Sequence, residues 1–197
     1  MTDESIARLR ISLADTEPEV WRRVDVLPTA SLNMLHDITQ AAMGWEDYHL
    51  WMFEAEGRRY GLADPEWPDR ELTAAKDIKL GALTERGVHQ LTYTYDLGDN
   101  WEHVITVEAI LPGDPDAKYP RFIEGARRCP PEDVGSIPGY ENFLEAVANT
   151  NHEEHAEILA WYGAPYDPDN IDELITERRV AAIATRRAAG SGQGSVR

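Results

Sequence analysis

Three stretches of the first 60 residues have the hydrophobic patterns of strands, two of them alternating and one apolar on both faces. Residues 7–13 and 20–26 each place apolar side chains on one face and more polar ones on the other, which is typical of strands with one buried face. Residues 48–55 are largely apolar on both faces. This last pattern predicts an interior strand of a sheet that is covered on both sides.

The middle of the chain has the pattern of a β-hairpin. Two alternating stretches, residues 88–95 and 101–111, flank a loop of Asp, Leu, Gly, Asp and Asn. Pairing Tyr93 with His103 across the hairpin gathers the apolar side chains on one face and the threonines on the other. A shift of one residue would mix the two sets, which a sheet with a buried face resists. We therefore predict a five-residue loop at residues 96–100, with a left-handed conformation at Gly98.

Helices are predicted near the start of the chain and at its C-terminal end. Ser31 has the position of an N-cap, apolar residues follow it with helical spacing, and Gly44 stands where a helix commonly ends. Further helices are expected at about residues 139–148, 152–162 and 171–187. The predicted fold is α+β, with a mixed, mainly antiparallel sheet built from residues 6–111 with one early helix, followed by a helical C-terminal part.

The charges are distributed unevenly along the chain. The 197 residues include 36 acidic and 19 basic ones, for a net charge of −17. Residues 178–197 contain five arginines and no acid. We expect residues 1–177 to form a single α+β domain and residues 178–197 to be a basic helix end and a flexible tail. Because the acidic body repels phosphate, nucleic acid is not an expected partner.

Several features favour the cytoplasm. No stretch has the roughly 18 continuous apolar residues of a membrane span, so no membrane association is expected. The first ten residues carry acids where a signal peptide has basic residues. Cys129 is the only cysteine, which rules out an internal disulfide framework and suits a reducing compartment.

Five segments of the chain, in a fixed order, resemble the plasmid pRiA4b open-reading-frame-three-like family, a bacterial family. They are GWEDYHLWMFEAEGRRYG, YTYDLGDNWEHVITVE, YPRFIEGARRCPPEDVG, GYENFLEAV and HEEHAEILAWYG. The similarity spans about residues 6–175. It implies an α+β fold with a mixed sheet and a helical C-terminal part, and it suggests an association with mobile DNA elements.

The chain departs from the family pattern at three places. Trp51 stands where the family has a second histidine, Val134 and Ser136 flank a single Gly135, and residues 151–153 lack the usual proline. The first departure weakens any metal site that would use position 51. The resolvase label of some members does not fit either, because a serine resolvase needs a nucleophilic serine among several arginines. Apart from two arginines on the first strand, no serine here has such a cluster.

The hairpin loop and its flanks supply the candidate binding residues. Asp96, Asp99 and His103 lie within eight residues, a combination that could hold a hard metal or supply a general base. Asp, Gly and Asn are also the residues that turns use, and His103 on the apolar face is better interpreted as a core histidine. A small pocket at this end of the hairpin would be formed by seven residues in all: Tyr48, His49, Tyr95, Asp96, Asp99, Trp101 and His103.

Two other candidates have stronger structural interpretations. His152 and His155, near Glu157, have the i, i+3 spacing of a helical metal pair, but a lone pair specifies little, and acids in a first helical turn stabilise the helix without a ligand. Cys129 has two neighbouring arginines and is followed by two prolines, which favours a rigid loop over a catalytic thiol. No cofactor and no metal are predicted.

Three functional hypotheses follow from the sequence. The preferred one is a non-enzymatic binding or interaction module, whose partner is a protein or a small molecule. The second is a metal-dependent hydrolase or nuclease that uses Asp96, Asp99 and His103, with His49 as a further ligand. The third is a DNA recombination accessory protein that depends on the arginine-rich tail.

Overall fold

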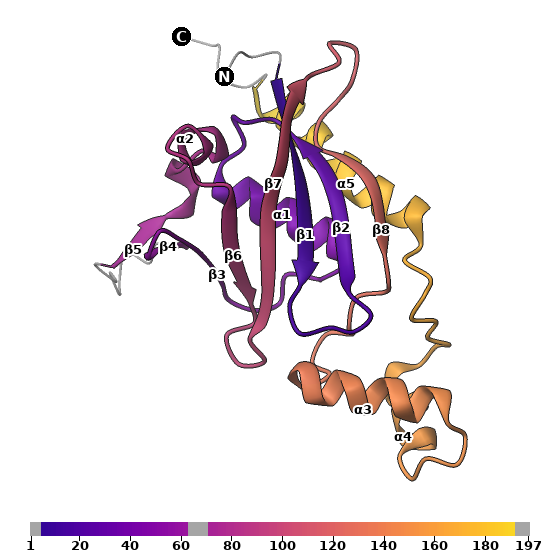
Figure 1. The fold of residues 1–197 in the computed structure, drawn as a ribbon. Coiled ribbons are helices and arrows are strands. Elements are labelled where there is room, and N and C mark those ends of the chain that lie inside the picture. Colours follow the sequence, from indigo (N-terminus) through magenta and orange to yellow (C-terminus); the bar gives the residue numbers. More distant parts are fainter. Residues whose placement is uncertain (1–4, 63–70, 192–197) are drawn as a thin grey trace.

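The protein, described by a computed structural model for residues 5–62 and 71–191, is built on one twisted eight-stranded sheet (Figure 1). The strands lie in the order β5-β4-β3-β6-β7-β1-β2-β8. All neighbours are antiparallel except the β4–β5 pair, so the predicted mixed, mainly antiparallel sheet is confirmed. The strands are β1 (Ser5–Leu13), β2 (Val20–Val26), β3 (Trp51–Ala55), β4 (Arg58–Gly61), β5 (Leu72–Ala74), β6 (Gln90–Tyr95), β7 (Trp101–Pro112) and β8 (Arg121–Ala126).

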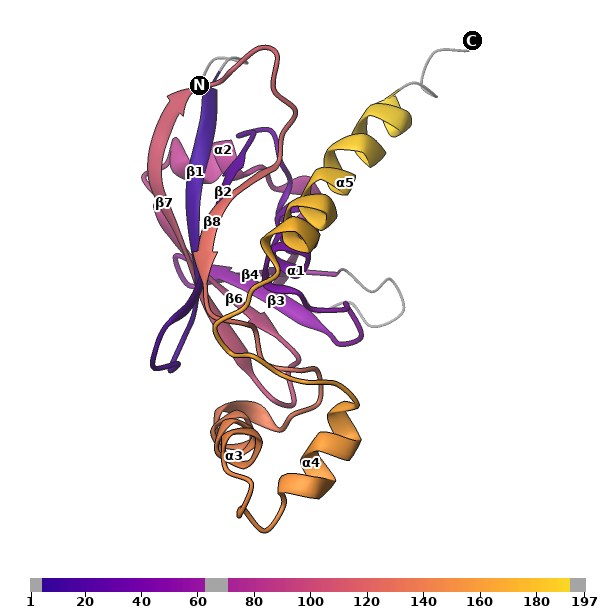
Figure 2. The ribbon, with the colours of Figure 1, turned by 90° about the vertical axis from the view of Figure 1, so that its right-hand side faces the viewer.

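The helices are unevenly placed around this sheet. Helices α1 (Leu32–Met43) and α5 (Glu173–Ser191) lie on one face, as Figure 2 shows, and α5 packs against α1 and β8. Helices α3 (Ser136–Ala148) and α4 (His155–Tyr162) lie beyond the end of the sheet at which the β6–β7 loop is found (Figure 1). Short helical segments η1 (Ala75–Asp77) and α2 (Leu80–Thr84) complete the fold.

The predicted local signals are confirmed in α1 and in the hairpin. The Ser31 side chain accepts the N–H of Met34, and Gly44 ends the helix with a φ of 110°. Tyr93 pairs with His103 across β6 and β7, and both side chains are fully buried. The five-residue loop between β6 and β7 is confirmed as well. These predictions hold because hydrophobic alternation and capping are local signals that the fold does not override.

Two boundaries of the sheet differ from the prediction. The sheet extends past residue 111, because Arg121–Ala126 adds β8 at the edge beside β2. The interior strand begins at Trp51, not at residue 48, and Tyr48 and Leu50 are 68% and 66% exposed. Apolar side chains in a loop at the end of the sheet had given the appearance of a strand covered on both faces.

Helix α5 crosses the expected end of the domain at residue 177. Val180 and Ile183 are buried in the core, so the packed part of the chain continues past that position. The expected flexible tail falls largely on residues 192–197, which lie outside the described residues. In the described ranges, no helix is both long and apolar enough to cross a membrane.

Two buried histidines join the sheet to α1 and to the segment that follows it. His36 Nδ1 lies 2.7 Å from the Tyr93 hydroxyl. His103 Nε2 accepts a hydrogen bond of 3.1 Å from the Trp45 indole, which requires the neutral form of the ring. Burial lowers the pKa of both imidazoles, that of His103 to about 4.

These shifts predict that acid destabilises the fold. An unfolded histidine has a pKa of about 6.5, so between about pH 6.5 and pH 4 the unfolded chain binds protons that the folded chain excludes. The stability from neutral His103 is fully present above about pH 6.5 and is lost as the pH falls towards 4, by roughly 3 kcal/mol. Denaturant unfolding between pH 7.5 and 5 should show this decline. His103→Gln, which keeps an acceptor for Trp45 but cannot titrate, should have a shallower slope, and an equal slope would contradict the assignment.

Candidate functional site

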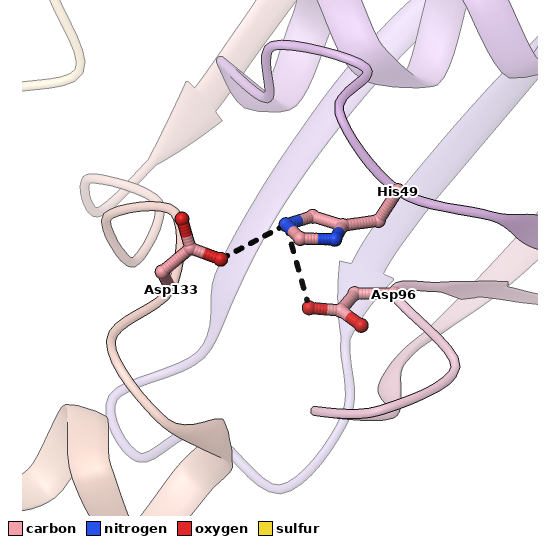
Figure 3. Close-up of side chains that lie close together, drawn as sticks. All are labelled: His49, Asp96 and Asp133. Carbon is pink, nitrogen blue, oxygen red and sulfur yellow. Dashed lines mark ion pairs between the residues drawn. The ribbon is translucent and has the colours of Figure 1, made fainter.

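Three loops that are far apart in the sequence meet at one end of the sheet. Residues 44–50 join α1 to β3, residues 96–100 join β6 to β7, and residues 127–135 join β8 to α3. Figure 3 shows His49 from the first loop between Asp96 from the second and Asp133 from the third. The meeting of these loops forms the candidate site.

His49 Nε2 lies among three carboxylates. Its distances are 3.0 Å to Asp133 Oδ1, 3.6 Å to Asp96 Oδ2 and 3.8 Å to Glu132 Oε2. The nitrogen is inaccessible to solvent, and it has no partner with hydrogen-bond geometry in the part of the chain that the structure describes. Such a buried polar atom without a partner is uncommon, because the loss of hydration is not compensated.

The hairpin loop presents one carboxylate oxygen of Asp96 to His49. Asp96 has a φ of 53°, a left-handed conformation that aspartate tolerates better than most residues. Its Oδ1 accepts the N–H groups of Gly98 and Asp99, at 2.9 and 3.3 Å, which fixes the side chain in an Asx turn. Oδ2 is left to face His49.

Tyr95 and Glu132 support the centre from the side of the sheet. The Tyr95 hydroxyl accepts the N–H of Tyr48 at 2.9 Å and donates to Glu132 Oε1 at 3.0 Å. Glu132 Oε1 also accepts the N–H of Glu46. Burial raises the pKa of Glu132 and of Tyr95. One tyrosine hydroxyl therefore joins the loop of His49 to the loop of Asp133.

Asp99 has a positioning part in this arrangement. Its Oδ2 accepts the N–H of Gly135 at 3.1 Å, which connects the hairpin loop to the segment that carries Asp133. Asp99 is absent from the group of ligand atoms that lie together, which consists of His49, Asp96 and Asp133. The sequence-based interpretation of Asp99 as a ligand is therefore replaced by one in which it holds a loop.

Besides the buried Tyr95, two more of the proposed site residues belong to the core. Trp101 is 1% exposed and His103 is fully buried. Both nitrogens of His103 face internal partners, Nε2 the Trp45 indole and Nδ1 the carbonyl oxygens of Tyr93 and Trp101. His103 is thus placed in the core, as its strand position indicated, and both of its ring nitrogens face internal groups instead of the loops of the candidate site.

The remaining candidates have local partners. His152 lies before α4 and its Nδ1 accepts the N–H of Glu154, whereas His155 Nδ1 lies 2.6 Å from the carbonyl oxygen of Ala146. Cys129 is buried, and burial raises the pKa of its thiol, so the thiol stays protonated. The structural interpretations of the histidine pair and of Cys129 agree with these contacts.

Asp133 and Glu132 are the site residues that sequence reasoning missed. They follow two prolines, a context that predicts a rigid loop. A signal was present in the run Glu132-Asp133-Val134-Gly135, where acids precede a glycine, but Asp133 lies 84 residues from His49 and no local pattern connects them. Asp133 also has a positive φ of 58°. Such uncommon backbone conformations occur often at functional sites.

The distances from His49 Nε2 to the oxygens of Asp96 and Asp133 suit one divalent cation. Metal–nitrogen and metal–oxygen bonds of about 2.0–2.2 Å place neighbouring ligands roughly 3.0–3.5 Å apart. The two separations of 3.0 and 3.6 Å from His49 Nε2 are close to that range. One imidazole with two carboxylates suits Zn²⁺ or Mn²⁺ better than Mg²⁺, which prefers oxygen ligands and retains its water.

Comparison with known proteins gives the relationship of the chain. The plasmid pRiA4b ORF-3-like protein family matches residues 5–174. The chain belongs to this family. Uncharacterized protein y4hQ of Sinorhizobium fredii is 42% identical over 160 residues, which are 81% of this chain and 82% of that protein. The crystal structure of MM3350, a protein of unknown function from Methanosarcina mazei Go1, has a TM-score of 0.81 at 34% identity and covers 91% of this chain and 99% of that one.

The departure of this pRiA4b ORF-3-like protein at position 51 does not affect the candidate site. Trp51 is 6% exposed and stacks on His36 with the ring centroids 4.1 Å apart. The cluster of His49, Asp96 and Asp133 forms without any contribution from residue 51. The tryptophan adds to the core where the expected histidine would have added a titratable group.

The contact between Asp99 and Gly135 predicts a local effect on the third loop. Asp99→Ala should remove the acceptor of the Gly135 N–H and speed hydrogen exchange of that amide by about tenfold or more, since the loss of one hydrogen bond costs roughly 1 kcal/mol or more. Asp99→Asn keeps an acceptor oxygen and should leave the exchange rate nearly unchanged. Equal protection of Gly135 in the alanine variant would contradict the contact.

The expectation for Gly98 is revised. Gly98 is not among the residues with positive φ, so Gly98→Ala carries no penalty from a left-handed backbone. An added Cβ would lie 3.2 Å from Asp96 Oδ1, and that oxygen would have to shift by a few tenths of an ångström. The substitution is thus a mild disturbance of Asp96 and not the damaging change that the turn sequence suggested.

Proposed function

We propose that the protein is a cation-dependent binding module, in which His49, Asp96 and Asp133 bind one first-row divalent cation. The observation that carries the proposal is His49 Nε2, a buried nitrogen without a hydrogen-bond partner and within 4 Å of three carboxylates. Imidazole nitrogen and carboxylate oxygen together are a common ligand set for such cations.

A cation explains this geometry better than an internal ion pair does. A protonated His49 would point its Nε2–H bond at one of the carboxylates, because a charge-assisted hydrogen bond is strong. Asp133 Oδ1 is near enough at 3.0 Å, yet the contact lacks hydrogen-bond geometry. A neutral imidazole whose lone pair binds a cation needs no hydrogen bond at Nε2. The cation also offsets the repulsion between the carboxylates.

The surroundings favour a binding partner that covers the site. Tyr48, Leu50 and Leu97 are 68%, 66% and 52% exposed and belong to the same two loops as His49 and Asp96. Exposed apolar side chains beside a polar centre are typical of interaction sites. We propose that the partner is a protein or a small molecule and that the protein acts in the cytoplasm. We also propose an association with mobile DNA elements, because the family name refers to a plasmid.

Metal binding is testable on protein made without a polyhistidine tag and treated with a chelator. We expect Zn²⁺ or Mn²⁺ to raise the melting temperature with a stoichiometry of one, by an amount equivalent to about 2.7 kcal/mol at a hundredfold excess over the dissociation constant. His49→Gln and Asp133→Asn should abolish the shift. Elemental analysis of the wild-type protein measures the stoichiometry directly.

Matched controls separate this centre from general surface effects. His89→Gln and Asp77→Asn change exposed residues of the same types elsewhere and should leave the metal-induced shift intact. A wild-type melting temperature that does not respond to either cation would refute the proposal. So would a response that persists in both His49→Gln and Asp133→Asn.

A metal-dependent hydrolase is the second candidate, because the group of ligand atoms comes from only three residues. Catalytic zinc sites commonly have three protein ligands and leave a position for water. We expect any such activity to appear as Mn²⁺- or Zn²⁺-dependent cleavage of bis(4-nitrophenyl) phosphate or 4-nitrophenyl acetate. It should be lost in Asp133→Asn and retained in Asp77→Asn. Metal binding without turnover on either ester would leave the binding module as the function.

A further inference from the structure

A cavity of about 360 Å³ lies beside the candidate cation centre. Its wall is formed by the end of α1 and the loop after it, the segment that follows β8, and the start of α5 with the two residues before it, together with one residue each of β2 and α4. Three arginines line it, namely Arg22, Arg128 and Arg179. Its volume is within the range of sites that hold small organic molecules.

Arg22 is the least expected of these residues. It occupies an inward-facing position of β2, in line with Val20 and Val24, and is 1% exposed. Its Nε donates to the carbonyl oxygen of Ala42, and its Nη1 donates to those of Trp21 and Ala126. Nη2 has no partner among these hydrogen bonds, and no carboxylate of the described residues forms an ion pair with Arg22.

A buried guanidinium without a counterion is costly. Arginine stays protonated under all ordinary conditions, and moving its charge out of water costs several kcal/mol unless an anion and full hydrogen bonding compensate. Burial lowers the pKa of Arg22, which reflects this cost. The three carbonyl groups supply part of the compensation, and Nη2, which forms none of these hydrogen bonds, is the group left to bind an anionic oxygen.

The two other arginines of the cavity are also without carboxylate partners in the described ranges. Arg179 donates to the carbonyl oxygens of Gly44 and Trp45, and the Arg128 guanidinium lies 5.3 Å from the Tyr166 ring centroid. Other arginines of the chain pair with acids: Arg8 with Asp25, Arg10 with Glu19, Arg23 with Glu108, Arg86 with Glu56 and Arg127 with Asp169. In a chain with nearly twice as many acids as bases, this cavity brings together three arginines that form no ion pair with a carboxylate of the described residues.

Three acids also line the cavity, and each of them accepts a hydrogen bond from a group other than the three arginines. Asp172 accepts the N–H of Ile175 at the start of α5, Glu46 accepts the Tyr48 hydroxyl, and Glu132 accepts the Tyr95 hydroxyl. None of them forms an ion pair with the three arginines in the part of the chain described. Because these carboxylates repel an anion, the ligand must be small enough to reach Arg22 without approaching them.

We propose that this cavity binds a small organic anion, with its carboxylate or phosphate group at Arg22 and with Arg128 and Arg179 as further cationic contacts. Guanidinium groups bind both kinds of oxyanion through charge-assisted hydrogen bonds. The site goes beyond the proposed cation centre and does not depend on it. Because Glu132 lines the cavity and also faces His49, a ligand held here would lie next to a bound cation.

The test is calorimetric titration of chelator-treated protein with inorganic phosphate and, separately, with succinate, at constant ionic strength. We expect saturable binding of at least one of them, with phosphate and succinate as the arms that distinguish the two oxyanions. Arg128→Gln should weaken the binding about tenfold or more, and Arg22→Gln should abolish it. Arg86→Gln, which removes a surface arginine paired with Glu56, should have no effect.

The measurements remain decisive if Arg22→Gln fails to fold, because the wild-type and Arg128→Gln titrations stand on their own. No binding of either anion to the wild-type protein would overturn the proposal. Equal binding by the wild-type, Arg128→Gln and Arg179→Gln proteins would overturn it too. Because the cation is removed throughout, a failure to bind the anion is distinct from a failure to bind the metal. Retention of anion binding in His49→Gln would confirm that the two sites are separate.

Discussion

The hydroxyl groups of two tyrosines on β6 connect the sheet to the other parts of the structure that matter for function. Tyr93 and Tyr95 are two residues apart, so they point to the same face of the sheet. The Tyr93 hydroxyl contacts His36 and Gln40 of α1, and the Tyr95 hydroxyl contacts Tyr48 and Glu132 in two different loops. A buried hydroxyl must find partners. This requirement fixes the helix on the sheet and brings together the loops that form the candidate centre.

The end of the sheet beyond Tyr95 combines two features of opposite charge. On one side His49 lies among carboxylates, and on the other Arg22 lies in a cavity without a carboxylate partner in the described ranges. Glu132 takes part in both. With both proposed sites filled, the anion in the cavity would lie next to the cation at His49, because Glu132 borders both. This end of the sheet also differs from an ordinary core, because buried polar groups that serve only stability are normally hydrogen-bonded to one another.

Much of the fold was predictable because its signals are local. The cap at Ser31, the end at Gly44 and the register of Tyr93 with His103 each depend on a few neighbouring residues and were predicted correctly. The sheet was predicted too short, since β8 lacks clear alternation and depends on pairing with β2. Tyr48 and Leu50 were assigned to a covered strand because an apolar residue in a loop has the same sequence signal as one in a core.

The sequence by itself determined the class of fold, the strands of the central hairpin and the first helix, and it named Tyr95, His49 and Asp96 as candidates for a site. Periodicity and capping act over one or two turns of the chain, so they can be recognised without a partner. The tertiary structure alone decided that Asp133 and Glu132 face His49, that Asp99 holds a loop, and that Arg22 lies in a cavity beside Arg179. These contacts join residues that are 36 to 157 positions apart. Their formation depends on how strands pair and helices pack, which no local pattern contains.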